Sequence, residues 1–427
     1  MTISATAPAL PIHPSNEPPA AVRRGRRPTG IAVRATTTLA AAGLLLAATA
    51  CSSSGDGATA PTTTVAPATS AAPPATTAPA TAAPAATAPP NPARLAMLDG
   101  ILQSHHDAGE FVGARIALRD RDGTITEATA GTPTVDPASG PVDPDVAWGV
   151  GSVTKTFVAV VALQLAQEGR IDLDAGIQQY LPTLPGADRI TPRQLLQHTS
   201  GLAEYVDKPA VLNDAHRTWT PDELIAVAEA AGRLGEPGAA FHYANTNYIV
   251  LGEIIQQVTG HPWTDEVRTR IVEPLGLTST RMMSADAAPG FVVDGGSFVD
   301  ATTIWDASIG GSAGALQSTG RDLLTFGTAL ADGTLLSPES QAAMRAFIPG
   351  EDYSQFGIVH RYGLGLEEYS NGAITVVGHM GTGADAAAFL GYDPADRATV
   401  AVMMNTANPG PQAFMALEAL TAASNPG

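Results

Sequence analysis

The 427-residue sequence is poor in cysteine, in lysine and in charged residues generally. Its single cysteine excludes an intrachain disulfide and any zinc site built from several thiolates. Only two of the 23 basic residues are lysines, Lys155 and Lys208, and 41 acidic residues bring the formal net charge to −18. Nucleic-acid binding requires a clustered basic surface, so this composition argues against a nucleic-acid partner.

The N-terminal segment has an apolar run, but one too short to cross a membrane. The run covers residues 39–50, whereas a spanning helix needs about 20 residues. Five arginines precede it, and Cys51 follows it directly. This arrangement is typical of an export signal, and its end resembles a bacterial lipoprotein signal. We therefore predict that residues 1–51 are a signal peptide and that lipidated Cys51 anchors the protein to the outer face of the cell membrane. An ordinary secretory signal with an incidental cysteine is the alternative.

Residues 52–92 have a composition that cannot form a packed core. Of these 41 residues, 36 are alanine, proline, threonine or serine, and nine are proline. Such a segment favours extended conformations, so we predict a disordered linker. Residues 93–427 are then the folded domain. Because residues 1–50 hold five arginines and one glutamate, the rest of the chain has 18 basic and 40 acidic residues.

Hydrophobic periodicity and turn residues predict strands near both ends of the folded part and helices between them. The predicted helices cover 95–106, 153–167, 248–258, 263–272 and 411–423, and the predicted strands cover 111–118, 123–129, 373–378, 386–392 and 399–404. Two further helices should begin at Thr191-Pro192 and Thr220-Pro221, where an N-cap residue precedes a proline. This order predicts one sheet assembled from N- and C-terminal strands, with a helical insertion.

Ser152 and Lys155 stand at the start of the apolar helix predicted over 153–167. Residues three apart share a helix face, so the hydroxyl and the amine can meet. Serine is a weak nucleophile that needs an adjacent base, and burial near a helix N-terminus lowers the pKa of an amine toward neutrality. The spacing is common by chance, but lysine is scarce here and costly in an apolar helix. We therefore interpret the pair as functional.

Two later segments add polar residues in a matching order. Tyr243 and Asn245 stand just before a predicted helix, and His379 and Gly381 stand at the end of a predicted strand. The ordered set Ser-x-x-Lys, Tyr-x-Asn and His-x-Gly resembles the serine β-lactamase and penicillin-binding-protein superfamily. It is most similar to the class C branch, which includes D-alanyl-D-alanine carboxypeptidases and related esterases. The resemblance implies an α/β (α+β) fold of the β-lactamase/transpeptidase type, with a central antiparallel sheet flanked by helices and an all-helical subdomain.

The resemblance also implies a role for each motif residue. Ser152 would attack a carbonyl group to form an acyl-enzyme, and Lys155 would accept its proton. Tyr243, with phenolate character stabilised by Lys155, would relay the proton to the leaving group. Asn245 would bind the substrate amide, His379 would replace a lysine of the family's third motif, and the N–H groups of Ser152 and Thr382 would form the oxyanion hole. The implied substrate-binding residues are Asn245, His379, Gly381 and Thr382.

Each of these residues also has a structural interpretation. Tyr243 could be a core aromatic residue, Asn245 a helix N-cap and His379 a buried residue at a strand end. We interpret residues 198–201 as a helix-ending turn. Residues 310–314 match the Gly-x-Ser-x-Gly elbow of α/β-hydrolases, but the segment before them is too polar for a central strand, so we regard that match as coincidental.

One position departs from the family pattern in a way that affects the predicted substrate. Met380 stands where penicillin-recognising members usually have a hydroxyl residue that binds the substrate carboxylate. A carboxylate would then depend on His379 or Arg361. We predict a secreted serine hydrolase that is D-alanyl-D-alanine carboxypeptidase-like or β-lactamase-like and acts on cell-wall peptides or lactams. An esterase for small esters or lactones is one alternative, and a non-catalytic peptidoglycan-binding protein is another. We expect a monomer that acts on a small molecule or short peptide, without a cofactor or metal.

Overall fold

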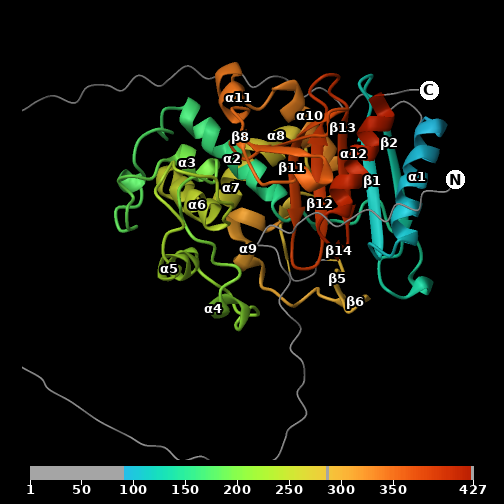
Figure 1. The fold of residues 1–427 in the computed structure, drawn as a ribbon, viewed down its shortest axis with the longest axis horizontal. Helices are drawn as coiled ribbons and strands as arrows, with labels where there is room; N and C mark the ends of the chain where they lie inside the picture. The colour runs from blue at the N-terminus through green and yellow to red at the C-terminus, as the bar shows by residue number, and fades with distance from the viewer. Residues whose placement is uncertain (1–90, 285–287, 425–427) are drawn as a thin grey trace, which may run out of the picture. The chain divides into compact units, whose positions relative to one another are not determined.

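The computed structural model of the protein describes residues 91–284 and 288–424 (Figure 1). The predicted signal peptide, including Cys51, and the predicted linker up to residue 90 lie outside the described residues. Within the described part, no helix is both long enough and apolar enough to span a bilayer.

An eight-stranded antiparallel sheet forms the centre of the described structure. N- and C-terminal strands lie side by side in it, as predicted, because β1 pairs along its whole length with β13 (Figure 1). From one edge to the other, the strands are β2 (Ile125–Gly131), β1 (Gly113–Arg119), β13 (Thr399–Met404), β12 (Ala387–Tyr392), β11 (Thr375–Thr382), β10 (Glu367–Ser370), β9 (Val359–Tyr362) and β8 (Ile348–Pro349).

Helices cover both faces of this sheet. On one face, α1 (Pro92–Asp107) and α12 (Pro411–Ser424) join the strand side chains in one apolar cluster. On the other face, α2 (Val153–Gln167) and α10 (Gly320–Asp332) belong to a second cluster. Because both faces are covered, β12 and β13 are buried at every position. The α+β class predicted from the sequence is therefore confirmed.

The middle of the chain forms the predicted helical region. Its helices are α3 (Pro192–Leu196), α4 (Pro209–Leu212), α5 (Pro221–Ala231), α6 (Thr246–Thr259), α7 (Trp263–Val267), α8 (Glu273–Leu275), α9 (Ala307–Gly314) and, after α10, α11 (Pro338–Met344). Thr191 and Thr220 both form capping boxes at predicted helix starts. The single helix predicted over 263–272 is instead α7 followed by a π-helical turn, Arg268–Val272.

Two small sheets were not predicted. One contains β3 (Trp148–Gly149), β7 (Leu316–Ser318) and β4 (Arg281–Met282), and the other contains β14 (Thr406–Ala407), β5 (Phe291–Asp294) and β6 (Ser297–Asp300). Strands of two to four residues have no measurable periodicity, and apart from the local pairing of β5 with β6 they are defined by long-range pairing.

The start of α2 lies against the end of β11, and two glycines permit this close approach. Gly151 has a φ of 50°, and a Cβ atom there would lie 2.7 Å from the backbone nitrogen of Thr382. A Cβ atom on Gly381 would lie 3.0 Å from the backbone nitrogen of Ser152. Only glycine adopts such a φ readily and leaves this space. The fold therefore brings the peptide groups of Ser152 and Thr382 together.

The aromatic rings of Phe157 and Phe326 join α2 to α10. The rings are stacked with centroids 3.7 Å apart, and both side chains are fully buried. Replacing Phe326→Ala leaves a cavity beside α2, so we expect the free energy of unfolding to fall by about 3–5 kcal/mol. Denaturant unfolding of the purified protein measures this change. Phe326→Leu refills part of the space and should lower the free energy of unfolding clearly less. A decrease of less than about 1 kcal/mol in the alanine variant would contradict the packing argument.

Candidate active site

Lys155 and Ser152 meet at the N-terminus of α2, as the sequence predicts. Ser152 occupies the N-cap position, and Lys155 is fully buried one turn later. The Lys155 Nζ lies 2.8 Å from Ser152 Oγ, 2.7 Å from Asn245 Oδ1 and 2.9 Å from the carbonyl oxygen of Ala313. A neutral amine at this point can donate to Asn245 and Ala313 and accept the proton of the serine hydroxyl.

The surroundings of Lys155 favour the neutral amine. Burial lowers the pKa of Lys155 to about 7, while the carboxylates of Glu204 and Glu367 oppose this shift. A group with a pKa near the ambient pH is well suited to general base catalysis, because a large fraction is unprotonated and the proton is still readily released. The geometry and the charge state therefore both suit Lys155 as the base for Ser152.

Asn245 is held in place by a buried acid that the sequence analysis did not identify. Glu204 Oε2 accepts hydrogen bonds from the backbone N–H of Asn245 at 2.7 Å and from its side-chain Nδ2 at 3.1 Å. Glu204 Oε1 accepts from the backbone N–H groups of Tyr205 and Val206. These contacts turn Asn245 Oδ1 toward Lys155. The sequence did offer one signal that could have revealed Glu204, because this acid stands inside the apolar segment 202–206.

The N-cap interpretation of Asn245 describes its position but not its side chain. Asn245 directly precedes α6, yet its side chain makes no capping hydrogen bond. It instead bridges Lys155 and Glu204, so its role is at the site.

Tyr243 lies next to the Ser152–Lys155 pair. The centre of its ring is 4.8 Å from Lys155 Nζ, and its ring stacks on His198 with centroids 4.2 Å apart. Burial and the charge of Glu367 raise the pKa of Tyr243 well above its usual value, although a hydrogen bond with Ser152 acts in the opposite direction. Tyr243 is therefore a protonated phenol near neutral pH, which differs from the phenolate character implied by the resemblance.

His198 belongs to a buried network behind Tyr243. Its Nδ1 accepts the backbone N–H of Ala244 at 3.2 Å, so its proton is on Nε2, which lies 3.1 Å from the hydroxyl of Tyr362. That hydroxyl lies 2.9 Å from His379 Nε2. The turn predicted over 198–201 is present, with a φ of 58° at His198. The imidazole of His198 also stacks on the ring of Tyr243, a contact that the turn pattern did not predict.

His379 was expected to bind substrate, but its side chain is buried away from the pocket beside Ser152. It is 1% exposed, and its Nδ1 faces the carbonyl oxygen of Met380 at 2.6 Å. It does not belong to the set of described residues that line the pocket beside Ser152. The structure therefore supports the alternative interpretation of His379 as a buried residue of the strand end.

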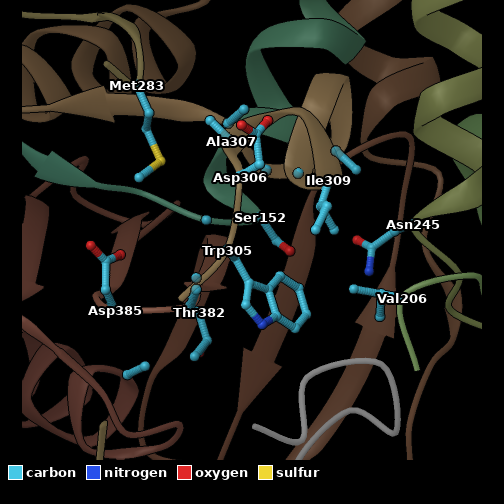
Figure 2. A pocket seen from close by; sticks show the side chains of 18 of the residues that line it. Ser152, Val206, Asn245, Met283, Trp305, Asp306, Ala307, Ile309, Thr382 and Asp385 are labelled. Carbon is cyan, nitrogen blue, oxygen red and sulfur yellow. The ribbon is translucent and has the colours of Figure 1, made fainter. Parts of the chain in front are cut away.

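A pocket opens beside Ser152, and Figure 2 shows its lining. Asn245 and Thr382 line it together with Ser152, and Trp305 and Ile309 provide apolar surface. Lys155 and Tyr243 lie behind this wall, and Gly381 makes room for the backbone at Ser152. The structure thus brings together all the predicted catalytic residues with Asn245, Gly381 and Thr382.

The pocket has no cationic side chain among the described residues that line it; its charged residues are Asp306 and Asp385. Met380 is buried in the cluster on the α1 and α12 side of the sheet. Arg361 forms an ion pair with Glu368 on the neighbouring strand. Neither expected group, His379 or Arg361, therefore lines the pocket to receive a substrate carboxylate.

The Gly-x-Ser-x-Gly match at 310–314 is not a nucleophile elbow. Ser312 lies within α9, is buried, and donates its hydroxyl to the carbonyl oxygen of Tyr248 at 2.8 Å. Its neighbour Ala313 provides the carbonyl group that Lys155 contacts. The segment thus contributes to the site through its backbone.

Comparisons with known proteins agree with this geometry. The family model for beta-lactamase matches residues 98–424. The PbpX protein of Bacillus subtilis (strain 168), which is named for the penicillin-binding proteins, is 30% identical over 55% of this chain. That match covers 62% of the relative, so the chain spans less than two thirds of its length. Penicillin-binding protein 4 of Amycolatopsis lactamdurans is 26% identical over 72% of this chain and 83% of its own.

Two solved structures are similar over nearly their whole length. A D-stereospecific amidohydrolase from Streptomyces sp. has a TM-score of 0.68 and 31% identity, over 76% of this chain and 98% of that one. The D-amino acid amidase from Ochrobactrum anthropi SV3 has a TM-score of 0.70 and 26% identity, over 77% of this chain and 98% of the amidase chain. With the family model matching most of the chain and the Ser152–Lys155 pair in place, the chain belongs to the beta-lactamase family of serine hydrolases.

Proposed function

We propose that the protein hydrolyses the amide bond of D-amino-acid amides through an acyl-enzyme on Ser152. The observation that carries this proposal is the 2.8 Å contact between Ser152 Oγ and the fully buried Nζ of Lys155. A buried amine whose pKa is lowered to about 7 has little structural value in an apolar helix, whereas a general base requires such a group.

The proposed reaction uses each residue of the site in turn. Ser152 Oγ attacks the substrate carbonyl carbon while its proton passes to Lys155 Nζ. The backbone N–H groups of Ser152 and Thr382 stabilise the oxyanion. The hydroxyl of Tyr243 donates its proton to the leaving group and is reprotonated from Lys155. Water then attacks the acyl-enzyme and gives one proton to Lys155 Nζ. The bond between the acyl carbon and Ser152 Oγ breaks, and Lys155 returns the proton to Oγ.

The pocket favours substrates without a terminal carboxylate. A D-alanyl-D-alanine carboxypeptidase or β-lactamase activity needs a group that binds this carboxylate, and the described lining residues offer only acidic charges, Asp306 and Asp385. One structural neighbour is named a D-stereospecific amidohydrolase and the other a D-amino acid amidase. These observations favour D-amino-acid amides over β-lactams and over peptides with a free C-terminal carboxylate. Small esters are a second candidate, since the same nucleophile and oxyanion hole serve them.

A role as a non-catalytic binding protein fits the site less well. Ser152, Lys155, Tyr243 and Asn245 are all present and all in contact with one another or with a shared partner. A chain that only bound peptides would gain nothing from an amine buried at this cost.

We expect the purified protein to hydrolyse a D-amino-acid amide faster than its L-counterpart, a D-Ala-D-Ala peptide or nitrocefin, with p-nitrophenyl esters as a general test of acyl transfer. The Ser152→Ala variant should lose on the order of 10⁴-fold or more in kcat/KM. It should also lose covalent labelling by a fluorophosphonate.

Ser312→Ala is the matched control, because Ser312 is a second buried serine whose neighbour Ala313 contacts Lys155. It should keep its fluorophosphonate labelling. Labelling that persists in the Ser152 variant, or disappears only in the Ser312 variant, would refute Ser152 as the nucleophile.

We further propose that the protein is exported and acts as a monomer tethered to the outer face of the membrane through lipidated Cys51. The support is the sequence of residues 1–51 together with the linker composition of 52–92. A lipid chain and a linker would hold a strongly acidic domain near the membrane, to which its charge alone would not bind it.

Cys51→Ala removes the proposed lipidation site, so we expect this variant to leave the membrane fraction of expressing cells. Fractionation followed by immunoblotting measures the distribution. Ser152→Ala, which leaves the N-terminal segment intact, should stay in the membrane fraction. Unchanged partitioning of the cysteine variant would rule out this anchor.

A further inference from the structure

His198 has a backbone conformation that is uncommon for a residue with a side chain. It lies just after the end of α3, where glycine is the usual residue of this conformation. Its φ is 58°, and in the described part of the chain Arg397 is the other non-glycine residue with a positive φ. The side chain of His198 is fully buried. A buried histidine at such a position points to a task for its imidazole.

Backbone and side-chain groups of His198 hold the loop that carries Tyr243 and Asn245. The carbonyl oxygen of His198 accepts the backbone N–H of His242 at 2.8 Å, and its Nδ1 accepts the backbone N–H of Ala244 at 3.2 Å. These two bonded residues are the chain neighbours of Tyr243 on either side. His198 therefore fixes the peptide groups on both sides of Tyr243.

The imidazole of His198 also fixes the ring of Tyr243. The two rings stack with centroids 4.2 Å apart and planes inclined by 24°. The imidazole is itself held by Tyr362, whose hydroxyl lies 3.1 Å from His198 Nε2 and whose ring meets it edge-on at 77°. That hydroxyl lies 2.9 Å from His379 Nε2 on its other side. The stacking surface under Tyr243 is thus a ring whose own rotation is restricted.

The orientation of the Tyr243 ring determines where its hydroxyl proton can go. A hydrogen bond joins this hydroxyl to Ser152, and Lys155 Nζ lies 4.8 Å from the centre of the ring. In the proposed reaction the C–N bond of the substrate breaks, and the departing nitrogen keeps the electron pair and takes the proton of Tyr243. Lys155 then gives Tyr243 the proton that it took from Ser152. Such a transfer requires hydrogen-bond distance, so a small rotation of the ring weakens it.

We propose that His198 is a positioning residue for this proton transfer, because its imidazole holds the phenol of Tyr243 in the orientation that protonates the leaving group. The inference rests on the proposed function, since it assumes acyl transfer to Ser152. His198 is not one of the described residues that line the pocket, so it acts through Tyr243 and not on the substrate. Its effect should be large only where the leaving group is too basic to depart without a proton.

The test compares two substrates with the same acyl group, D-phenylalanine p-nitroanilide and D-phenylalanine p-nitrophenyl ester. The anilide nitrogen needs a proton to leave, whereas p-nitrophenolate leaves as a stable anion. His198→Asn keeps an acceptor for the Ala244 N–H and tolerates a positive φ, but it removes the stacked ring. We expect kcat/KM for the anilide to fall about 10- to 100-fold and that for the ester to fall less than about threefold.

A double-mutant cycle shows whether His198 acts through Tyr243. Tyr243→Phe removes the proton donor, so it should reduce kcat/KM for the anilide far more than kcat/KM for the ester. Adding His198→Asn to this variant should lower the anilide value less than about twofold further, because the group that His198 positions is already gone.

His360→Asn is the matched control, because His360 is a second buried histidine with contacts of the same kind. Its Nδ1 accepts the backbone N–H of Glu351 at 2.9 Å, and its ring stacks on Tyr353 with centroids 5.0 Å apart. This variant should leave the ratio of the two kcat/KM values unchanged. If His198→Asn does not fold, Tyr362→Phe takes its place, since it removes only the hydroxyl beside His198 Nε2 and should lower the anilide value selectively, by a smaller factor.

Equal losses on both substrates in His198→Asn, or in Tyr362→Phe where that variant replaces it, would mean a structural role and would overturn the inference. So would an undiminished effect of His198→Asn in the Tyr243→Phe background, or a wild-type protein that is labelled at Ser152 and cleaves the ester but not the anilide. Absence of fluorophosphonate labelling in the wild-type protein would overturn the proposed function itself, which separates the two failures.

Discussion

Burying the amine of Lys155 costs free energy, and most features of the site serve to make that burial tolerable without holding the amine permanently charged. Asn245 Oδ1 and the carbonyl oxygen of Ala313 accept its hydrogen bonds. The carboxylate of Glu204 does not contact Lys155 directly, because the side chain of Asn245 lies between them. A direct ion pair would favour the charged form and raise the pKa of Lys155, which would spoil it as a base. The intervening amide is thus as important as the acid behind it.

The site lies at the junction of the sheet and the helical region, and each contributes different groups. The helical region supplies Asn245 and Tyr243 at the start of α6 and Ala313 from α9. The sheet supplies Thr382 at the end of β11, which the close packing of Gly151 brings to the serine. Helix α2, packed between them and stacked on α10 through Phe157, carries Ser152 and Lys155 on one rigid element. Groups fixed in this way need little reorganisation during the reaction.

The sequence predicted the regular elements well because their patterns are local. The helix predicted over 153–167 and the strand predicted over 399–404 match α2 and β13 at both ends. The short strands β8, β9 and β10 were missed because strands of two to four residues show too little periodicity, although each of them pairs with a strand that is its neighbour in sequence. The Ser152–Lys155 pair was singled out by the scarcity of lysine and the order of the motifs, and its catalytic role stays a prediction.

The residues that tune the site were harder to find because their roles depend on burial and on what lies opposite them. Glu204 occurs in a segment without a recognisable motif, and only the fold shows that this acid is buried and holds Asn245. His379 matched a motif position, but its burial and its contact with Tyr362 place it behind Tyr243 instead of on the pocket wall.

The central claim is that Lys155 acts as a neutral base, and the pH dependence of acylation tests it most directly. Pre-steady-state acylation by a p-nitrophenyl ester should rise with pH through a single ionisation near 7 and then level off, since the pKa of Lys155 is lowered to about 7 and only the unprotonated amine accepts the serine proton. Lys155→Arg, which stays protonated, should acylate slowly at every pH. An acylation rate that does not change between pH 5 and 9, or an arginine variant that retains the wild-type rate, would contradict this account.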